Sequence, residues 1–297
     1  MIRRPRKWQE RLHDRFWVEV TRRLAVESPV GGCASGLNEP SSVSESMDWP
    51  GICHAFAQCR IPSDGFRRLR GVRDVVETVG AVDGRHYAAL VCRWAPEWLL
   101  SPDVASVDSW GDPLTWPRLL LGTPRSFSPT TLRYLATALW MERQGLFDGN
   151  PAIVEIGVGF GGLAAMNQII GGHRTHMVDL PDVEECAKKF LSQLGLDETV
   201  VERKELDAYP NRVVISNYAF SELESGVQDI YLNKYLIGST HGVIVSNAAI
   251  FATSIGGRND DQLVGWLRDA GISAYIDEAN DLRSPGDALC GVRMIRW

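Results

Sequence analysis

The nine residues from Val154 to Gly162 read VEIGVGFGG, and a second apolar run ends at Asp179, 22 residues after Gly157. The first run predicts a buried strand that passes into a glycine-rich turn and opens a helix. Glycine lacks the Cβ atom that would collide with a ligand lying on the backbone. The spacing corresponds to one strand–helix–strand step, so the Asp179 carboxylate is expected at the tip of the neighbouring strand. This pattern indicates a nucleotide-type cofactor whose ribose hydroxyls bond to Asp179.

Two cofactor classes fit the glycine run. Gly157, Gly159 and Gly162 match the dinucleotide pattern GxGxxG. With Glu155 ahead of them and Gly161 as the third glycine, the run also matches ExGxGxG, the first motif of S-adenosylmethionine (SAM) methyltransferases. Glu155 favours SAM, because a carboxylate there can bond an ammonium group but would repel a pyrophosphate. The alternative without a ligand is a tight turn that packs a helix onto the sheet.

The stretch 213–223 reads VVISNYAFSEL, a buried strand that ends in polar and aromatic residues. Ligands of open α/β sheets bind at the carboxyl ends of the strands, so Asn217 and Tyr218 are expected at the reactive end of the cofactor. Glu222 follows one helical turn later and is a candidate general base for a hydroxyl. Its alternative role is structural, as a partner of Ser221 in a capping box or of the helix dipole. Asp179 has a similar alternative as a helix N-cap.

His241 directly precedes a strand expected at Gly242–Ser246. An imidazole can act as a base near neutral pH, and His241 is therefore a third candidate catalytic residue. It lies at the N-terminal end of the strand, however, which favours a solvated loop histidine. Ser246 and Asn247, at the other end of this strand, are expected to face the pocket.

After residue 150 the sequence predicts alternating strands and helices, the pattern of a parallel α/β fold. Strands are expected at 152–156, 175–180, 199–203, 212–216 and 242–246, and helices at 161–170, 182–194, 222–236 and 259–270. No helix fits between two closing strands, 273–276 and 289–295, so they are expected to pair as an antiparallel hairpin. Only eight residues, 204–211, separate the third and fourth strands. A crossover helix needs more room, so it is absent or one turn long, or the third strand is misplaced.

The first half of the chain has a different composition, since eight of the ten Trp and eleven of the fifteen Pro precede residue 150. The expected elements are an amphipathic helix at 5–27, a loop at 31–50, a strand pair at 82–92 around Asp83-Gly84, an irregular stretch at 94–129 and a helix at 129–144. Ser128 is expected to cap that last helix, with Pro129 in its first turn. The tryptophans either line an acceptor pocket or pack in the core.

The whole-chain composition narrows the classes of partner. The chain has 297 residues, is 44% hydrophobic and carries a net charge of −6, which argues against a nucleic-acid backbone as its main partner. No apolar run reaches the roughly 20 residues of a membrane span, and no signal peptide is expected. The six cysteines form no CxxC pair, so we expect reduced thiols in a cytoplasmic protein. His173 and His176 have no third ligand nearby, so no metal site is expected.

Taken together, the glycine motif with Glu155, the run Val178-Asp179-Leu180-Pro181 and the run ISNYAFSEL at 215–223 resemble the bacterial sugar O-methyltransferases. The resemblance covers roughly residues 124–250 well. It implies a Rossmann-like, mostly parallel, seven-stranded sheet with an antiparallel C-terminal hairpin, in a methyltransferase domain at 126–297 behind a partly helical N-terminal region at 1–125. It also implies SAM as cofactor and, as partner, a small-molecule or glycan acceptor with a free hydroxyl. A homo-oligomer is left open.

The positions of the residues, together with the resemblance, assign roles to particular residues of this chain. Glu205 or Asp207 would meet the adenine by position, although the short connection at 204–211 leaves this open. The expected cofactor-binding residues are Glu155, Gly157, Gly159, Phe160, Gly161, Asp179, Leu180, Asp207 and Asn217. The expected catalytic residues are Glu222, Tyr218 and His241.

Two other functions remain open from the residues alone. An NAD(P)-dependent oxidoreductase would share the glycines, but no Tyr-x-x-x-Lys or other hydride-transfer constellation lies in the right place, and Glu155 disfavours it. The other is a methyltransferase-like domain that binds a partner protein through its aromatic N-terminal half without catalysis.

Overall fold

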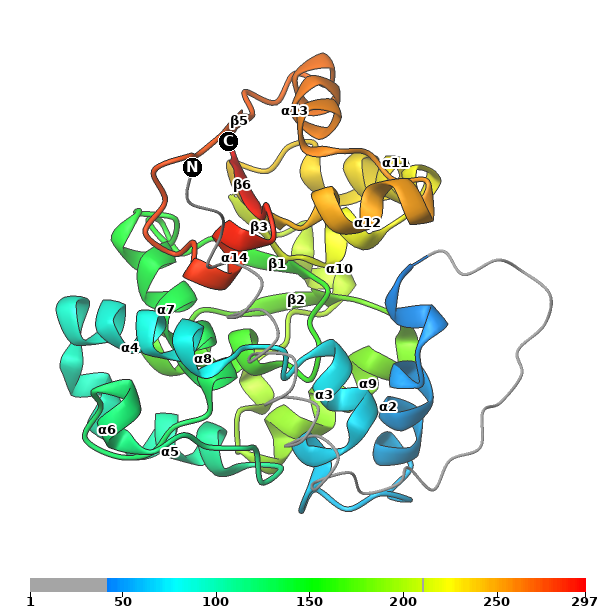
Figure 1. Ribbon diagram of the computed structural model, residues 1–297. Coiled ribbons are helices and arrows are strands. Elements are labelled where there is room, and N and C mark those ends of the chain that lie inside the picture. The colour runs from blue at the N-terminus through cyan, green and yellow to red at the C-terminus, as the bar shows by residue number, and fades with distance from the viewer. Residues whose placement is uncertain (1–41, 210) are drawn as a thin grey trace, which may run out of the picture.

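A computed structural model describes residues 42–209 and 211–297 of the chain (Figure 1). The helix expected at 5–27 lies outside the described residues, and of the loop expected at 31–50 only residues 42–50 are described. These nine residues contain a short 3-10 helix, η1 (Ser44–Ser46), and the start of helix α2.

A single six-stranded sheet forms the centre of the molecule. Its strands are β1 (Ala152–Ile156), β2 (Thr175–Val178), β3 (Arg212–Asn217), β4 (His241–Ser246), β5 (Tyr275–Ile276) and β6 (Arg293–Arg296). They lie in the order β2-β1-β3-β4-β6-β5. The first four in this order are parallel, whereas β6 pairs antiparallel with both β4 and β5. The structure therefore confirms a Rossmann-like, mostly parallel sheet that closes with an antiparallel pair.

The sheet has six strands rather than the expected seven, because the strand predicted at 199–203 does not form. In its place Val200 makes one isolated parallel bridge with Thr175 at the edge of the sheet. The one-turn helix α10 (Arg203–Leu206) follows and leads to β3. With so few residues before β3, the chain can cross the sheet only with a one-turn helix, and the edge strand shrinks to a single contact.

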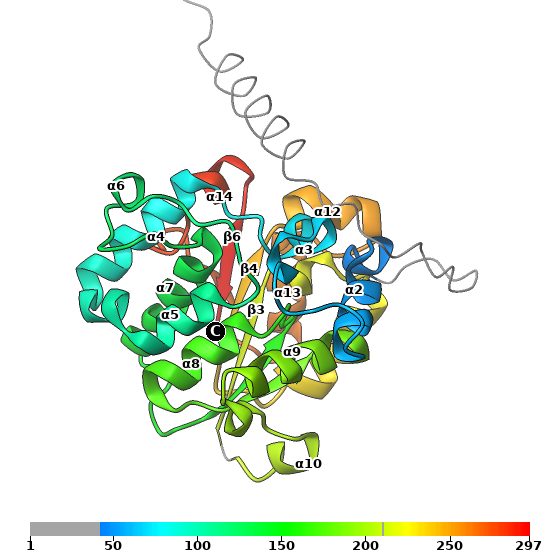
Figure 2. The ribbon, with the colours of Figure 1, turned by 90° about the horizontal axis from the view of Figure 1, so that it is seen from below.

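The two faces of the sheet bury separate apolar clusters, because alternate residues of a strand point to opposite sides. Ile153, Val213 and Ile215 belong to one cluster, together with α7 (Pro129–Arg143), α8 (Gly162–Gly171) and α9 (Pro181–Gln193). Val154, Val214 and Ile244 belong to the other, with η6 (Leu232–Leu236) and α13 (Asp260–Asp269). Figure 2 shows helices on both sides of the strands.

The described part of the N-terminal half consists of helices joined by loops, and it covers the first of these faces. Its helices are α2 (Trp49–Ala57), η2 (Phe66–Arg68), α3 (Arg70–Val75), α4 (Ala81–Trp94), η3 (Pro96–Leu100), α5 (Pro102–Ser109) and α6 (Arg118–Leu121). Helix α4 packs on α7, and α2 packs on α9. The stretch expected to be irregular, 94–129, thus contains three short helices.

The strand pair expected at 82–92 is also wrong, because this segment is the middle of helix α4. Asp83-Gly84 suggested a turn, but Gly84 lies inside the helix. A Cβ at Gly84 would come within 2.8 Å of the Cβ of Pro129, so this glycine lets α4 approach α7 closely. Helix α7 itself is confirmed, with the Ser128 hydroxyl accepting a hydrogen bond from the Thr131 N–H.

The C-terminal third differs from expectation in two places. The helix expected at 222–236 is divided into η5 (Ala219–Glu222), α11 (Ser225–Tyr231) and η6, and α12 (Ala248–Ile255) follows β4. A helix also lies between the two closing strands, α14 (Pro285–Leu289). Ser284 and Asp287 form a capping box at its start, so the Ser-Pro sequence marks a helix N-terminus rather than a plain loop.

The tryptophans of the described N-terminal half mostly pack in the core. Trp110 and Trp140 are buried there, and Trp49 is buried and also lines the cavity described below. Among the described helices, none is both long enough and apolar enough to cross a membrane.

Candidate functional site

A cavity of about 1370 Å³ opens at the carboxyl ends of the four parallel strands. Each of these strands contributes a residue at its tip: Gly157 after β1, Asp179 after β2, Asn217 at the end of β3 and Asn247 after β4. This is the edge at which open α/β sheets bind ligands. The cavity exceeds the roughly 300–1,000 Å³ that one ligand commonly needs, so it has room for two molecules.

Glu155 brings an unpartnered carboxylate to the floor of this cavity. The residue is 2% exposed, and its Oε2 atom has no hydrogen-bond partner. Burial, and then the nearby Asp179, raise the pKa of Glu155 well above its usual value. A buried acceptor without a donor is costly, so a ligand that carries a cationic N–H donor would stabilise this side chain.

Asp179 fastens the glycine-rich turn to the tip of β2. Its Oδ2 accepts a hydrogen bond from the Val158 N–H, and its Oδ1 accepts one from the Leu180 N–H, both at 2.8 Å. Burial raises the pKa of Asp179 to about 7, although these backbone donors oppose the rise. Helix α9 has Leu180 at its N-cap position, with no side-chain cap. Asp179 therefore does not serve as the cap, and its carboxylate lines the cavity.

Gly157 and Gly159 line the cavity in left-handed backbone conformations, with φ of +82° and +56°. A Cβ at Gly157 would lie 2.0 Å from the Cβ of Ala219, so only glycine lets the turn after β1 meet the turn after β3. Gly161 faces Ala187 and Phe190 of α9, where a Cβ would be 3.2 Å from both, and it serves helix packing.

Phe160 does not lie where the sequence suggested. It is fully buried in the core, with its ring stacked on Trp110 and edge-on to Tyr134 and Phe190. Leu180 does line the cavity. The structure thus brings together Glu155, Gly157, Gly159, Asp179, Leu180 and Asn217 of the expected cofactor residues, and leaves Phe160 and Gly161 in the packing behind them.

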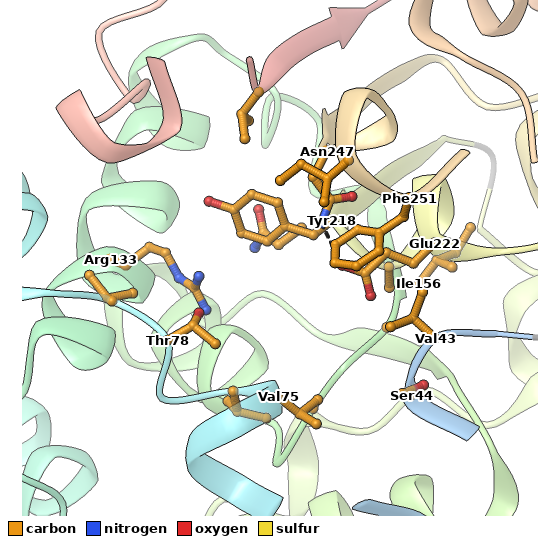
Figure 3. Close-up of a pocket in the computed structure, with 18 of the residues that line it drawn as sticks. Val43, Ser44, Val75, Thr78, Arg133, Ile156, Tyr218, Glu222, Asn247 and Phe251 are labelled. Carbon is orange, nitrogen blue, oxygen red and sulfur yellow. Dashed lines mark hydrogen bonds between the residues drawn. The ribbon is translucent and has the colours of Figure 1, made fainter. Parts of the chain in front are cut away.

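Glu222 and Asn247 form a hydrogen-bonded pair on the wall of the cavity (Figure 3). The Asn247 amide donates to Glu222 Oε1, and Ser221 Oγ donates to the Asn247 amide oxygen, which fixes the orientation of the amide. Burial raises the pKa of Glu222, and the Asn247 amide partly counteracts this. Helix α11 starts at Ser225 without a side-chain cap, so Glu222 does not act as its cap.

Tyr218 is held in an uncommon backbone conformation, with φ of +71°. Its hydroxyl donates to Asp287 Oδ1 at 2.9 Å, and its N–H donates to the Val245 carbonyl oxygen at 2.8 Å. Non-glycine residues at positive φ carry strain of about 1–3 kcal/mol and occur preferentially at functional sites. The neighbouring Asn217 Nδ2 is buried without a hydrogen-bond partner, as Glu155 Oε2 is.

Three candidates lie away from the cavity. His241 is exposed at the N-terminal end of β4, opposite to the edge that carries the site, because the strand runs parallel to its neighbours. Asp207 is exposed just after α10, and Glu205 pairs with Arg174 at 3.2 Å. None of the three lines the cavity, so their expected roles in catalysis and adenine binding have no support in the geometry.

Sequence reasoning missed the groups that close the cavity on its other side. Arg133 of α7, Tyr87 of α4 and Asp287 of α14 all line it. Asp287 Oδ2 accepts hydrogen bonds from Tyr87 and from Ser284, while its other oxygen accepts from Tyr218. One signal existed: Arg133 is the only charged residue between Pro129 and Met141, an otherwise uncharged stretch.

Apolar side chains complete the walls, from α12, α14, the end of α3 and the segment between α3 and α4. They include Ile250, Phe251, Val75, Val79 and Leu289. Within residues 42–209 and 211–297, no three His, Cys, Asp or Glu side chains are grouped so that they could hold a metal ion.

No protein-family model and no curated protein sequence matches the chain. Among solved structures, an O-methyltransferase family protein from Burkholderia thailandensis is 17% identical over 56% of this chain, with a TM-score of 0.38, and the chain spans 59% of its length. The pyocyanin biosynthetic protein PhzM is 17% identical over 86% of this chain and 69% of its own, with a TM-score of 0.38. The N-terminal domain of human METTL16, in complex with SAH, is 16% identical over 56% of this chain and 70% of its own, with a TM-score of 0.39. Likeness at this level assigns no activity.

Proposed function

We propose that this protein is a SAM-dependent methyltransferase. The observation that carries the proposal is the buried Glu155 carboxylate, whose Oε2 lacks a donor at the floor of a cavity that two positive-φ glycines leave open. An ammonium group such as that of the SAM methionine would supply the donor. A dinucleotide would instead bring a pyrophosphate to this turn, next to a carboxylate that repels it.

The residues at the strand tips fit the other parts of SAM. Asp179 has lone pairs left for two ribose hydroxyls after accepting its two backbone N–H groups. The unpartnered Asn217 Nδ2 offers a donor to the methionine end. When bound, SAM supplies an electrophilic methyl group. The protein contributes by placing an acceptor atom in line with that methyl at about 3 Å, which can account for much of the rate.

We further propose that the acceptor atom is a hydroxyl oxygen and that Glu222 takes its proton. Glu222 lies in the cavity with a raised pKa, and Asn247 holds its carboxylate in one orientation. Both features suit a general base. The acceptor class that the sequence resemblance implies is a sugar, free or attached to a small natural product. Tyr218, one residue beyond β3, would orient the acceptor.

The location we propose is the cytoplasm. Cys53 and Cys186 are both buried and are free thiols, which fits a reducing compartment. We propose no metal, and the oligomeric state is to be measured alongside binding.

The first test is calorimetric titration of the purified protein with SAM, S-adenosylhomocysteine (SAH) and NADH. The proposal expects micromolar binding of SAM and SAH, weakened at least tenfold in Asp179→Ala, and no binding of NADH. Asp207→Ala is the matched control, since Asp207 is a carboxylate outside the cavity and should leave binding unchanged. NADH binding alone would make the protein an oxidoreductase, and binding of none of the three would favour a scaffold without catalysis.

A further inference from the structure

Arg133 is the buried cation of the cavity wall. It projects from α7, where every residue from Pro129 to Met141 is buried, and is itself only 8% exposed. Figure 3 shows its guanidinium reaching into the cavity from the side opposite Glu222. A charge at this depth needs a partner, because desolvation of an unpaired ion is costly.

Residues 42–209 and 211–297 do not provide an anionic partner. Arg133 Nε has no hydrogen bond, and within the described part of the chain no carboxylate oxygen lies within ion-pair distance of its guanidinium. The other deeply buried arginine of this region, Arg67, is by contrast paired with Glu77 and hydrogen-bonded to Ser128.

The neighbours of Arg133 are aromatic faces rather than anions. Its Cζ atom lies 5.3 Å from the ring centroid of Tyr134 and 5.4 Å from that of Tyr218. Asp287 acts on Arg133 through its charge, but it already accepts hydrogen bonds from Tyr218, Tyr87 and Ser284. The cation–π contacts orient the guanidinium and leave its outward N–H groups to the cavity.

We propose that Arg133 is the receptor for a carboxylate-type anion that enters the cavity with a ligand. This inference rests on the proposed function, and the anion has two sources: the carboxylate of the cofactor's methionine, or an acidic group on the acceptor. In both cases the planar guanidinium forms charge-assisted hydrogen bonds with two oxygens of the anion.

The first arm of the test compares two adenosine thioethers in the full-length protein. SAH carries the methionine carboxylate, and 5′-methylthioadenosine lacks it. If the cofactor is the source, Arg133→Gln weakens SAH binding about 10- to 100-fold, the range expected for lost hydrogen bonds to a charged group, and leaves 5′-methylthioadenosine binding unchanged. In the wild-type protein, sodium benzoate then competes with SAH but not with 5′-methylthioadenosine, which requires no variant.

The second arm addresses the acceptor. If the acceptor is the source, Arg133→Gln leaves SAH affinity unchanged, and benzoate or inorganic phosphate raises the melting temperature of the wild-type SAH complex but not that of the variant complex. Arg133→Lys retains the positive charge but lacks the planar set of guanidinium N–H donors. In either arm it should recover part of the anion binding that Arg133→Gln loses. Arg143→Gln is the matched control, because Arg143 lies on the same helix over the ring of Trp94 and outside the cavity.

The inference is overturned if SAH affinity, its competition by benzoate and the stabilisation by anions are all the same with and without the Arg133 guanidinium. That result would leave Arg133 a structural cation. Failure of the proposed function looks different, since the wild-type protein would then bind neither adenosine thioether. In that case the benzoate and phosphate titrations of the free wild-type and Arg133→Gln proteins still decide whether Arg133 binds an anion.

Discussion

The carboxyl group of Glu155 is buried with one oxygen that no donor reaches, and this has a consequence for stability. Burial raises its pKa, so the folded protein holds a proton there that the unfolded chain releases near pH 4.5. Above that pH the folded state binds more protons than the unfolded state, and the free energy of unfolding therefore falls as pH rises through the raised pKa. Asp179, with a pKa of about 7, acts in the same direction.

We predict that Glu155→Gln flattens this dependence. At pH 8 the ligand-free variant should be about 1–3 kcal/mol more stable than wild type, because it has no carboxyl group that must take up a proton on folding, and at pH 5.5, closer to the unfolded-chain pKa of 4.5, the difference should be smaller. Urea unfolding at both pH values measures this. Asp207→Asn, at an exposed carboxylate, should retain the wild-type dependence. A larger gap at pH 5.5 than at pH 8 would contradict the assignment.

The same linkage predicts proton release on binding. An ammonium group near Glu155 and hydroxyl donors near Asp179 favour the charged carboxylates, so SAH binding at pH 7 should expel protons. The measurement is the calorimetric binding enthalpy in buffers of different ionisation enthalpy. 5′-Methylthioadenosine has no ammonium and should release fewer protons than SAH. Equal release by the two ligands would mean that Glu155 does not meet the ammonium.

Glu222 sets the expected pH dependence of catalysis. A base works when deprotonated, so kcat/KM should rise with pH through the raised pKa of Glu222 and then level off. In Glu222→Gln we expect a loss of about 10²- to 10⁴-fold in kcat and no rising limb, with SAH affinity unchanged. Glu224→Gln is the control, since Glu224 is exposed two residues away. Wild-type turnover of the acceptor by the Glu222→Gln variant would exclude Glu222 as the base.

At the scale of elements, two turns pack directly against each other at the site. The turn after β1 contacts the turn after β3 through Gly157 and Ala219, with no space for a side chain between them. This contact sets the width of the cavity floor between the expected cofactor and acceptor positions.

We predict that Gly157→Ala costs more than backbone strain alone. Gly172→Ala isolates the strain, because Gly172 also has a positive φ, +68°, but has open space around it. Gly172→Ala should destabilise by about 1–2 kcal/mol. Gly157→Ala should add a further loss of about 1–3 kcal/mol from the clash, and should weaken SAH binding. Chemical denaturation and calorimetry measure both. Equal losses in the two variants would show that the turns can move apart.

Sequence patterns predicted the elements of the sheet that depend on burial. The strands at 152–156, 212–216 and 242–246 consist mainly of apolar residues. A strand that is buried on both faces of a sheet has such a composition, so these strands could be predicted from the sequence. Asp179, Asn217 and Glu222 fall together because parallel strands end at one edge. The strand expected at 199–203 is absent because too few residues precede β3 for both a strand and a full crossover helix, so only the bridge between Val200 and Thr175 forms. Arg133 and Asp287 were missed because tertiary packing brings their helices to the site, and no local sequence pattern indicates such packing.

The Asp83-Gly84 sequence led to an incorrect prediction of a turn. A glycine beside an aspartate is typical of a turn, yet Gly84 is the contact point of two crossing helices, and Asp83 accepts a hydrogen bond from the Gly286 N–H across the chain. Local sequence contains no information about Pro129 and Gly286, so the close approach that requires Gly84 could not be predicted.

At the scale of the whole molecule, the expected boundary near residue 126 divides a continuous core. One apolar cluster contains Phe56 and Phe66 from the N-terminal half together with Phe160 and Phe190 from the sheet half. The Trp110 indole also donates a hydrogen bond to the Gln193 side chain of α9. A boundary crossed by so many buried side chains should not separate independent folding units.

We therefore predict one cooperative unfolding transition. Tryptophan fluorescence reports mainly on the N-terminal half, which holds eight of the ten tryptophans, whereas every strand of the sheet lies after residue 150. Denaturant curves followed by fluorescence and by far-ultraviolet circular dichroism should coincide within error. Two separated midpoints would instead support an accessory domain at 1–125 that folds by itself.

The single cavity that runs from Asp179 past Tyr218 to Arg133 also has a pharmacological consequence. Because these residues line one cavity, one compound can reach from the proposed adenosine position to Arg133. An adenosine joined by a short tether to an aromatic acid would engage Asp179 and Arg133 at once. Its second contact would form at an effective concentration in the millimolar range, and its affinity would exceed that of either fragment by a factor that depends on tether length. Such a compound would serve as an inhibitor before the natural acceptor is known.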